Sequence, residues 1–285
     1  MIGFNYLGKL GQLGNQMFQY ASLRGIARNR GVDFRLPFHR ELFDDGQGNK
    51  LNQGKPLRIE IFDPFIMSNV SQSNIGMIGS DNPHDASVID RTIAEEGFNF
   101  NENIFNNCPD NTTLYGYFQS EKYFKNVEEE IRQDYTFKPE IAIHCKHMMS
   151  TVDTPIGIHI RRGDYLINAA NHTNLGLDYY EECLKKFDKD RNVIIFSDDP
   201  AWCKEQDLFS SDRFLVAEGN DSFTDLCLMS LCSDFIIANS SFSWWGAWLS
   251  KGVDKVVCAP GNWFGPSNAH LDTSDLFPED WVIIK

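Results

Sequence analysis

The sequence is short of positive charge and has no long hydrophobic run. Its 285 residues carry 26 Lys and Arg against 40 Asp and Glu, so the formal net charge is −14. A nucleic-acid-binding domain usually presents a basic face to the phosphate backbone, and this balance argues against such a partner. No stretch approaches the about 20 apolar residues that a membrane-spanning helix needs, and the apolar run 1–7 is too short for a signal peptide. We therefore expect a cytoplasmic protein that binds no nucleic acid.

The sequence also lacks the spacings that mark metal sites and disulfide frameworks. Its seven cysteines are scattered and nowhere form Cys-x-x-Cys, which predicts neither a zinc knuckle nor a set of disulfides. His144 and His147 are three residues apart but have no third ligand at a suitable spacing. We expect no bound metal. A Gly-x-Ser-x-Gly elbow and a P-loop are missing as well.

Strand-like and helix-like patterns alternate at short intervals from residue 155 onward, which is typical of parallel strands covered by helices. Residues 33–120 give a weaker pattern, because they are rich in Asn, Asp, Gly and Ser and predict mostly loops. We expect two α/β domains, 1–150 and 151–285. The predicted strands are 1–7, 114–118, 156–160, 193–196, 214–216, 235–238 and 255–258. The predicted helices are 16–29, 121–135, 178–187, 201–206, 222–231 and 242–249, and residues 136–154 predict a further helix followed by a polar connection.

A pair of arginines lies in the stretch His-Ile-Arg-Arg-Gly-Asp-Tyr, residues 159–165, where a predicted strand ends. In open α/β sheets ligands gather beyond the carboxyl ends of the strands, and the guanidinium group matches phosphate oxygens two at a time. Arg161 and Arg162 are therefore candidates for holding an anion in an otherwise acidic protein. The alternative interpretation is structural, with both arginines at the surface and paired with Asp164 and nearby carboxylates.

The stretch Asn-Ser-Ser-Phe-Ser, residues 239–243, follows the predicted strand 235–238 and opens a helix. Free backbone amides at a helix N-terminus bind phosphate well, although a serine there also caps a helix without any ligand. This stretch and the arginine pair each follow a strand in the same half of the chain. That agreement favours one phosphate site at a shared edge of the sheet.

Two further features allow both a structural and a functional interpretation. Trp244 and Trp248 share one helix face, and with Trp245 they predict core packing rather than a sugar-stacking surface. Ser-Asp-Asp at 197–199 follows another predicted strand. These side chains suit two roles equally well, binding the hydroxyls or base edge of a ligand and capping the helix that follows. Asp225 lies near the same predicted edge, and its carboxylate suits the two adjacent N–H donors of a guanine.

Three stretches together have the order, spacing and composition of a known set of motifs. They are Gly-Gln-Leu-Gly-Asn-Gln-Met-Phe-Gln-Tyr-Ala at 11–21, the arginine stretch at 159–165, and Asn-Ser-Ser-Phe-Ser-Trp-Trp-Gly-Ala-Trp-Leu at 239–249. The chain thereby resembles the α-1,2-fucosyltransferases of glycosyltransferase family eleven over most of its length. Gln12 departs from the pattern, since a second glycine is common there. The eukaryotic members carry an N-terminal membrane anchor that is missing here, and in this respect the chain resembles a bacterial or viral relative.

The resemblance implies a GT-B architecture, in which two Rossmann-like domains face a cleft. Domain 1–150 would lie on the acceptor side, and domain 151–285 would bind GDP-fucose. The implied reaction is an inverting transfer of L-fucose from GDP-β-L-fucose to the 2-hydroxyl of a terminal β-galactoside, on an oligosaccharide or a glycolipid. It implies no metal and no cofactor besides the co-substrate GDP-fucose. A lipid-linked acceptor would bring the chain to a membrane surface.

The resemblance also implies roles for single residues. Without a metal, fixed donors must meet the charge that develops on the departing β-phosphate, and Arg161 would contact it with support from Arg162. Asp164 is a candidate for the general base, and orienting an arginine is its alternative role. The other implied residues are His159 and Asp225 for the guanine, Asn239, Ser240, Ser241 and Ser243 for the phosphates, and Gly14, Asn15 and Gln16 for the fucose and the acceptor.

Two rival functions stay open from the sequence. A fucosyltransferase of another linkage shares the arginine stretch, although the serine and tryptophan stretch at 239–249 favours the 1,2 linkage. A non-catalytic module that binds a nucleotide sugar or a glycan is the second rival. The presence of both arginines, the serines and Asn15-Gln16 argues against it.

Overall fold

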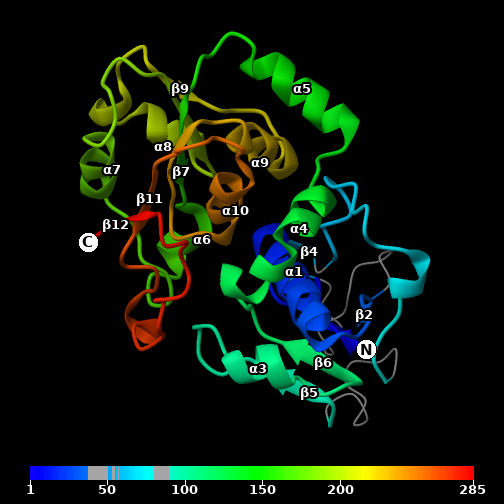
Figure 1. Cartoon of the computed structure of the whole chain (residues 1–285). Coiled ribbons are helices and arrows are strands. Elements are labelled where there is room, and N and C mark those ends of the chain that lie inside the picture. Colours follow the sequence, from blue (N-terminus) through cyan, green and yellow to red (C-terminus); the bar gives the residue numbers. More distant parts are fainter. Residues whose placement is uncertain (38–50, 53–54, 57, 80–89) are drawn as a thin grey trace. The chain divides into compact units, whose positions relative to one another are not determined.

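The computed structural model describes residues 1–37, 51–52, 55–56, 58–79 and 90–285 (Figure 1). They form two compact units, one of Met1–Thr136 with Asp272–Leu276 and one of Phe137–Leu271 with Phe277–Lys285. The boundary expected near residue 150 follows helix α5 (Pro139–Met149), whereas the units divide before it. Helix α5 packs on α9 (Ser222–Ser230), where the Cys145 thiol donates to the Thr224 carbonyl at 3.6 Å. Of the loops predicted over 33–120, residues 38–50, 53–54, 57 and 80–89 lie outside the described residues.

The first unit is built on a parallel four-stranded sheet with the strand order β2-β1-β6-β5. Ile2 lies opposite Phe34 on one side and Thr112 on the other. The strand order therefore reverses between β1 and β6, which are neighbours in the sheet but far apart in the chain. The strands are β1 (Ile2–Gly3), β2 (Phe34–Arg35), β5 (Thr92–Ala94) and β6 (Thr112–Tyr115), and β3 (Leu51–Asn52) and β4 (Lys55–Pro56) form a separate antiparallel pair.

The helix predicted over 16–29 is confirmed as α1 (Leu13–Arg30), which is buried along most of its length. It ends where Gly31 takes a left-handed conformation with φ 65° and donates its N–H to the Arg28 carbonyl at 3.1 Å. Glycine adopts this conformation without steric cost, so the glycine at position 31 accounts for the end of the helix. The other helices of the unit are α3 (Glu102–Asn107) and α4 (Glu128–Asp134), with short 3-10 turns η1 (Gln72–Asn74), η2 (Glu121–Tyr123) and η3 (Lys125–Val127).

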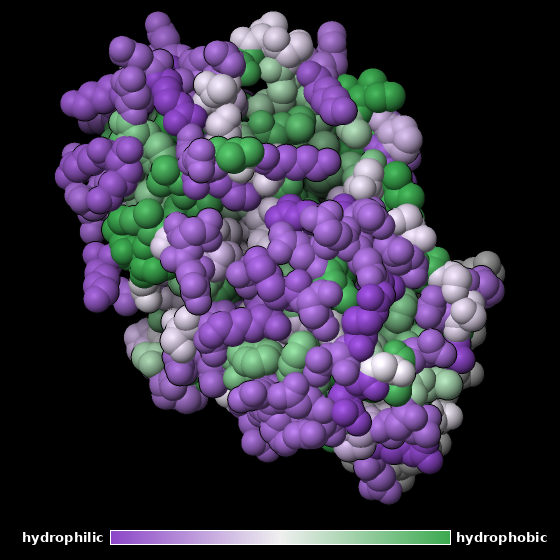
Figure 2. Space-filling view, viewed as in Figure 1, coloured by the Kyte–Doolittle hydropathy of each residue, from purple (hydrophilic) through white to green (hydrophobic). Residues whose placement is uncertain are grey.

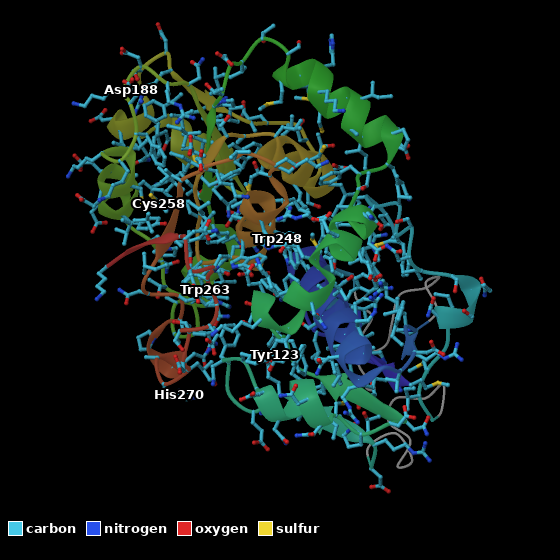
Figure 3. The ribbon with its side chains drawn as sticks, viewed as in Figure 1. Tyr123, Asp188, Trp248, Cys258, Trp263 and His270 are labelled. Atoms are coloured by element: carbon cyan, nitrogen blue, oxygen red, sulfur yellow. The ribbon has the colours of Figure 1, made fainter. Side chains whose placement is uncertain are left out.

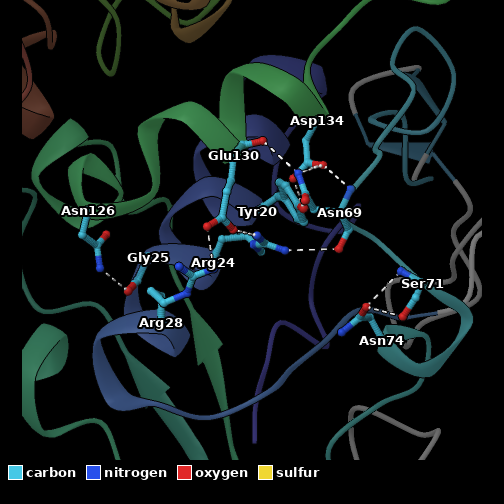
Figure 4. Close-up of polar contacts among 10 residues, drawn as sticks. All are labelled: Tyr20, Arg24, Gly25, Arg28, Asn69, Ser71, Asn74, Asn126, Glu130 and Asp134. Atoms are coloured by element: carbon cyan, nitrogen blue, oxygen red, sulfur yellow. Dashed lines mark hydrogen bonds and ion pairs between the residues drawn. The ribbon is translucent and has the colours of Figure 1, made fainter.

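A polar network joins α1 to α4 and to the loop at Asn69 (Figure 4). Glu130 pairs with both Arg24 and Arg28. The buried Asp134 accepts the Tyr20 hydroxyl at 2.6 Å and the Asn69 backbone N–H at 2.7 Å. Each buried charge thus has a partner, as burial requires. The network fixes α1, which starts at the carboxyl edge of the sheet.

The single helix predicted over 121–135 is wrong for its first half. Two 3-10 turns occupy this part, and the α-helix begins only at Glu128. Ser120 accepts the Lys122 N–H on its hydroxyl, and Phe124 leaves the helical conformation with φ −131°. The irregular turns place the backbone of Tyr123 directly against Gly25 of α1. Close packing here overrides the local helical pattern.

The second unit contains a parallel six-stranded sheet with the strand order β12-β11-β10-β7-β8-β9. In chain order this is the doubly wound pattern 6-5-4-1-2-3, with a reversal between β7 and β10. The strands are β7 (Ile156–Ile160), β8 (Val193–Ser197), β9 (Phe214–Val216), β10 (Asp234–Ile236), β11 (Val257–Pro260) and β12 (Val282–Ile284). The helices are α6 (Gly163–Ile167), α7 (Leu177–Leu184), α8 (Pro200–Lys204) and α10 (Ser241–Leu249) besides α5 and α9, with short turns η4 (Asp207–Phe209) and η5 (Pro266–Asn268).

The helices divide between the two faces of this sheet. Tyr180 and Cys183 of α7 and Cys203 of α8 join one hydrophobic cluster with the strands, while α9 packs against α10 and α5. The predicted core role of the tryptophans is confirmed, because Trp244, Trp245 and Trp248 of α10 are buried. Trp248 is labelled in Figure 3. The expected α/β class with two parallel sheets is confirmed.

Polar side chains predominate on the face shown in Figure 2. Over the described ranges, every helix is either too short or too polar to span a bilayer.

Candidate functional site

The arginine stretch and the serine stretch lie at the same edge of the six-stranded sheet. β7 ends at Ile160, directly before the arginines, and its neighbours in the sheet are β10 and β8. The serine stretch follows β10, and Ser197 ends β8. All three strands are parallel, so their carboxyl ends meet where the strand order reverses. Ligands of doubly wound sheets bind at such a point.

Arg161 is held between two carboxylates. Its Nη2 lies 2.5 Å from Asp164 Oδ1 and its Nη1 lies 2.9 Å from Asp198 Oδ2. Asp164 belongs to the first turn of α6, and Asp198 follows β8. The pairing with Asp164 and a nearby carboxylate, which the structural alternative predicts, is therefore present for Arg161. The guanidinium has five N–H groups, and these two contacts with carboxylates use two of its nitrogens.

Arg162 is fixed by a different set of contacts. Its Nε donates to Asp199 Oδ2 at 3.1 Å, and its guanidinium lies 3.8 Å from the ring of Trp202 on α8. Its backbone N–H donates to Asp198 Oδ1 at 2.9 Å. Asp199 also accepts the Trp202 N–H, so it caps α8, as one of the two alternatives for the 197–199 stretch predicts.

Tyr165 connects the two motif loops. Its buried hydroxyl donates to the Asn239 carbonyl at 2.9 Å. Its ring centroid lies 5.4 Å from the Arg161 guanidinium and 4.2 Å from the stacked His172 ring. The sequence places Tyr165 in the arginine stretch, but its contact across the sheet edge depends on strand pairing that the sequence does not state.

Asn239 and Ser243 hold the serine loop in place. The Asn239 amide donates to the carbonyls of Thr173 at 2.9 Å and of Trp263 at 2.8 Å, the latter in the loop after β11 (Figure 3). The buried Ser243 hydroxyl donates to backbone carbonyls, at 3.2 Å for that of Ser240. Both side chains, predicted to contact phosphate, thus use their donors within the protein.

Ser240 and Ser241 stand at the start of α10 and are both partly exposed. Ser240 is the N-cap residue, and its side chain makes no capping hydrogen bond. The N-terminal end of α10, where the first backbone N–H groups lack intrahelical acceptors, is therefore not capped by the Ser240 side chain. This arrangement suits an anion better than the capping alternative does.

His159 is buried on β7 beside Phe242, with 5.5 Å between the ring centroids. Its Nδ1 has no hydrogen-bond partner among the described residues. Buried polar atoms in native proteins nearly always have a partner. A ligand that supplies one would explain the orphaned nitrogen.

The buried imidazole makes stability depend on pH. Burial, and then the charge of Arg161, lower the pKa of His159 from 6.5 to about 3. Between these values the unfolded chain binds a proton that the folded chain does not, so stability present above pH 6.5 is lost as the pH falls. We expect the free energy of unfolding to drop by roughly 2 kcal/mol from pH 7 to pH 5 through this residue alone.

Urea unfolding at both pH values measures this effect. The variant His159→Asn should lose part of the pH dependence, and a change of the exposed His270 to Gln should leave the part due to His159 in place. An equal pH dependence in His159→Asn and the wild type would contradict the assignment.

Asp225 lies on the first turn of α9, which follows β9 and so starts at the same sheet edge. It accepts the Asn220 amide at 2.9 Å. Burial raises the pKa of Asp225. Within the described part of the chain it makes no hydrogen bond or ion pair with the arginine loop, so its guanine role stays a prediction.

The first-unit residues differ among themselves. Asn15 accepts the Gln119 amide on its side-chain oxygen at 2.8 Å, and Gly14 is buried. The buried Gln16 donates to the Arg58 carbonyl at 2.9 Å and accepts the Glu60 N–H at 2.6 Å. Gln16 therefore ties a loop to α1 instead of projecting outward as expected. The loop partner comes from a segment without a readable pattern, so this contact could not be predicted from the sequence.

Glu95 is a functional candidate that the sequence did not predict. Glu95 follows β5 and accepts the backbone N–H groups of Tyr117 at 2.7 Å and Phe118 at 2.9 Å. Burial raises the pKa of Glu95 to about 7. In the sequence it is one of two adjacent glutamates in a loop-like stretch, and only the fold distinguishes it. Over the described part of the chain, His, Cys, Asp and Glu form no group of three or more suited to a metal ion.

Two parallel α/β units, one with the doubly wound strand order, define a GT-B-like fold. The fold is similar to that of POFUT1 in its crystal structure with GDP, with a TM-score of 0.52 at 12% identity over 89% of this chain and 95% of that one. The chain belongs to glycosyltransferase family 11, whose family model, "Glycosyl transferase family 11", matches residues 97–285. The resemblance seen in the three motifs is thereby confirmed.

Curated relatives agree with this membership. The chain is 31% identical to the alpha-1,2-colitosyltransferase of Escherichia coli, over 96% of this chain and 97% of that protein. It is 27% identical to the O-antigen biosynthesis glycosyltransferase WbnK of Escherichia coli, over 95% and 97% of the two chains. It is also 25% identical to the galactoside 2-alpha-L-fucosyltransferase SEC1 of Bos taurus, over 85% of this chain and 63% of that protein.

Proposed function

We propose that the chain transfers L-fucose from GDP-β-L-fucose to the 2-hydroxyl of a terminal β-galactoside, with inversion and without a metal. The observation that carries the proposal is the junction of the two motif loops at the strand reversal. Tyr165 joins them through its hydrogen bond to the Asn239 carbonyl. Arginine N–H groups on one loop and helix amides on the other then serve one diphosphate.

The proposed chemistry depends on the leaving group. As the bond from fucose to the β-phosphate breaks, negative charge grows on GDP, and preorganised donors lower the barrier by meeting it. Arg161 takes this role, with Arg162, Ser240 and Ser241 around it. His159 and Asp225 hold the guanine in this proposal. Asn239 and Ser243 act by shaping the loop, because their donors are bonded to backbone carbonyls.

Asp164 is better suited to orienting Arg161 than to acting as a base. Its Oδ1 lies 2.5 Å from the Nη2 of Arg161, so this oxygen already holds the guanidinium in place. We assign Asp164 the orienting role.

The similarity to a colitosyltransferase supports a second candidate donor. Colitose is fucose without its 3-hydroxyl, so GDP-colitose presents the same diphosphate to the arginines. The two donors differ only in what contacts the sugar ring. A transferase for GDP-colitose would keep the whole phosphate site described above.

One assay separates the candidates. The purified chain is incubated with lactose and with either GDP-fucose or GDP-colitose in the presence of EDTA, and the linkage of any product is determined by NMR. We expect an α-1,2-fucosylated product from GDP-fucose. A product from GDP-colitose alone would favour the second donor, another linkage would favour the rival transferase, and GDP binding without turnover would favour the binding module.

A further inference from the structure

The first unit has its own strand reversal, between β1 and β6. The carboxyl ends of β1, β6 and β5 lie at one edge because these strands are parallel. The loop that leads into α1 follows β1, the loop 116–119 follows β6, and Glu95 follows β5. By the rule that holds for the second unit, a ligand is expected at this edge too.

Glu95 is the centre around which loop 116–119 turns. Its two carboxylate oxygens accept the backbone N–H groups of Tyr117 and Phe118. The loop approaches so closely that a Cβ on Gly116, whose φ is 149°, would lie 2.5 Å from the Glu95 Cβ. A glycine is therefore required to bring the loop onto the carboxylate. Each oxygen keeps acceptor capacity after one N–H bond.

Two exposed tyrosines lie next to the glycine of this loop. Tyr115 and Tyr117 are each 40% exposed, on either side of Gly116. The Tyr6 ring meets the Tyr115 ring edge-on, with centroids 4.9 Å apart, and so fixes it. Large side chains of this kind are usually more buried in a soluble protein, and exposed aromatics beside a polar group mark binding surfaces.

Buried amide oxygens complete the edge. Gln119 is 6% exposed, and its Nε2 donates to Asn15 at 2.8 Å. Gln19 is fully buried, and its Nε2 donates to the Gly116 carbonyl at 3.0 Å. The Oε1 atoms of both glutamines have no partner among the described residues. Because Gln19 is completely buried, the Gln119 oxygen is the one of the two that we consider as an acceptor for a ligand.

We propose that this edge of the first unit binds a neutral saccharide. The rings of Tyr115 and Tyr117 pack on its apolar C–H faces, and Glu95 and Gln119 accept hydrogen bonds from its hydroxyl groups. This combination fits a sugar better than a phosphate, because the site has a carboxylate and no described cation bonded to it. The proposal rests on the proposed function in one respect only, namely that the saccharide is the acceptor.

The test measures lactose binding and acceptor kinetics in three first-unit variants. In Tyr117→Ala and Glu95→Gln, we expect the KM for lactose to rise at least about tenfold, the size of a lost stacking or charged hydrogen-bond contact. The KM for GDP-fucose and the affinity for GDP should stay within about twofold of the wild type. Ile66→Ala, which removes another exposed apolar side chain of the same unit, should change none of these values.

Direct binding keeps this test separate from the proposed reaction. Saturation-transfer NMR with lactose should give a signal for the wild type that weakens strongly in Tyr117→Ala and survives in Tyr117→Phe, which keeps the ring. Absence of transfer with a normal lactose signal would overturn the proposed function but support the subsite. A wild type without a lactose signal, or variants with unchanged KM and signal, would overturn the subsite.

Discussion

Replacing Arg161 by alanine is expected to lower kcat about 10²–10³-fold, as removal of one preorganised donor does at an oxyanion site. The loss should fall on kcat because the charge on the leaving diphosphate is greatest in the transition state. Initial rates with GDP-fucose and lactose, together with GDP affinity by calorimetry, measure it. The variant should still bind GDP, since the α10 amides remain.

Two neighbouring substitutions serve as comparisons. Asp164→Asn keeps a side chain of the same shape beside Arg161 but removes its charge, so we expect a loss of about tenfold, at the lower end of the range for an orienting contact. Arg162→Ala should also cost less than Arg161→Ala, because Arg162 faces Asp199 and Trp202. A loss of less than fivefold in Arg161→Ala, or a larger loss in Asp164→Asn, would contradict the assignment of Arg161.

Carboxylates hold both arginines in place. Arg161 lies between Asp164 and Asp198, and Arg162 faces Asp199. These contacts restrict both side chains before any ligand arrives, and preorganisation reduces the entropy lost on binding. They also reduce the local positive charge. The site therefore depends on directed N–H groups more than on net charge, in keeping with a protein of net charge −14.

The second unit could be predicted well because its strands are short apolar runs buried under two helix layers. Ile156–Ile160 is buried throughout, and its neighbour Val193–Ser197 nearly so. Such runs stand out against the polar turns that separate them. The strand at Val282–Ile284 was missed because it lies at the sheet edge with partly exposed side chains.

The first unit could not be predicted to the same depth. Its strands have two to four residues each, too few for a period of hydrophobicity to develop. Its order comes instead from side-chain bonds over long separations, such as Gln16 with Arg58 and Glu95 with Tyr117. Polar contacts of this kind leave no spacing in the sequence. The motif at 11–21 can be recognised in the sequence, but the sequence does not show that the Gln16 side chain points into the protein.

The largest expected loss of stability comes from adding one methyl group to α1, in Gly25→Ala. In an open helix this change is stabilising by about 1 kcal/mol, because alanine favours the helix. Here a Cβ would lie 1.8 Å from the Tyr123 carbonyl oxygen and 2.7 Å from the Phe124 Cα. Both are backbone atoms, and the Gly25 carbonyl also accepts the Asn126 amide at 3.0 Å (Figure 4). We expect a loss of about 3 kcal/mol from overpacking.

The opposite signs of propensity and packing make this change decisive. Thermal unfolding should show a midpoint lower by roughly 5–10 °C for a chain of this size, and urea unfolding should follow. Glu129→Ala, at an exposed position of α4 in the same unit, should stay within about 0.5 kcal/mol of the wild type. A stabilised Gly25→Ala would mean that α1 and the turns at Tyr123 are further apart than described. The turns at Tyr123 lead directly into α4. Their contact with Gly25 therefore helps to hold α1, the helix that carries most of the motif at 11–21, in its place.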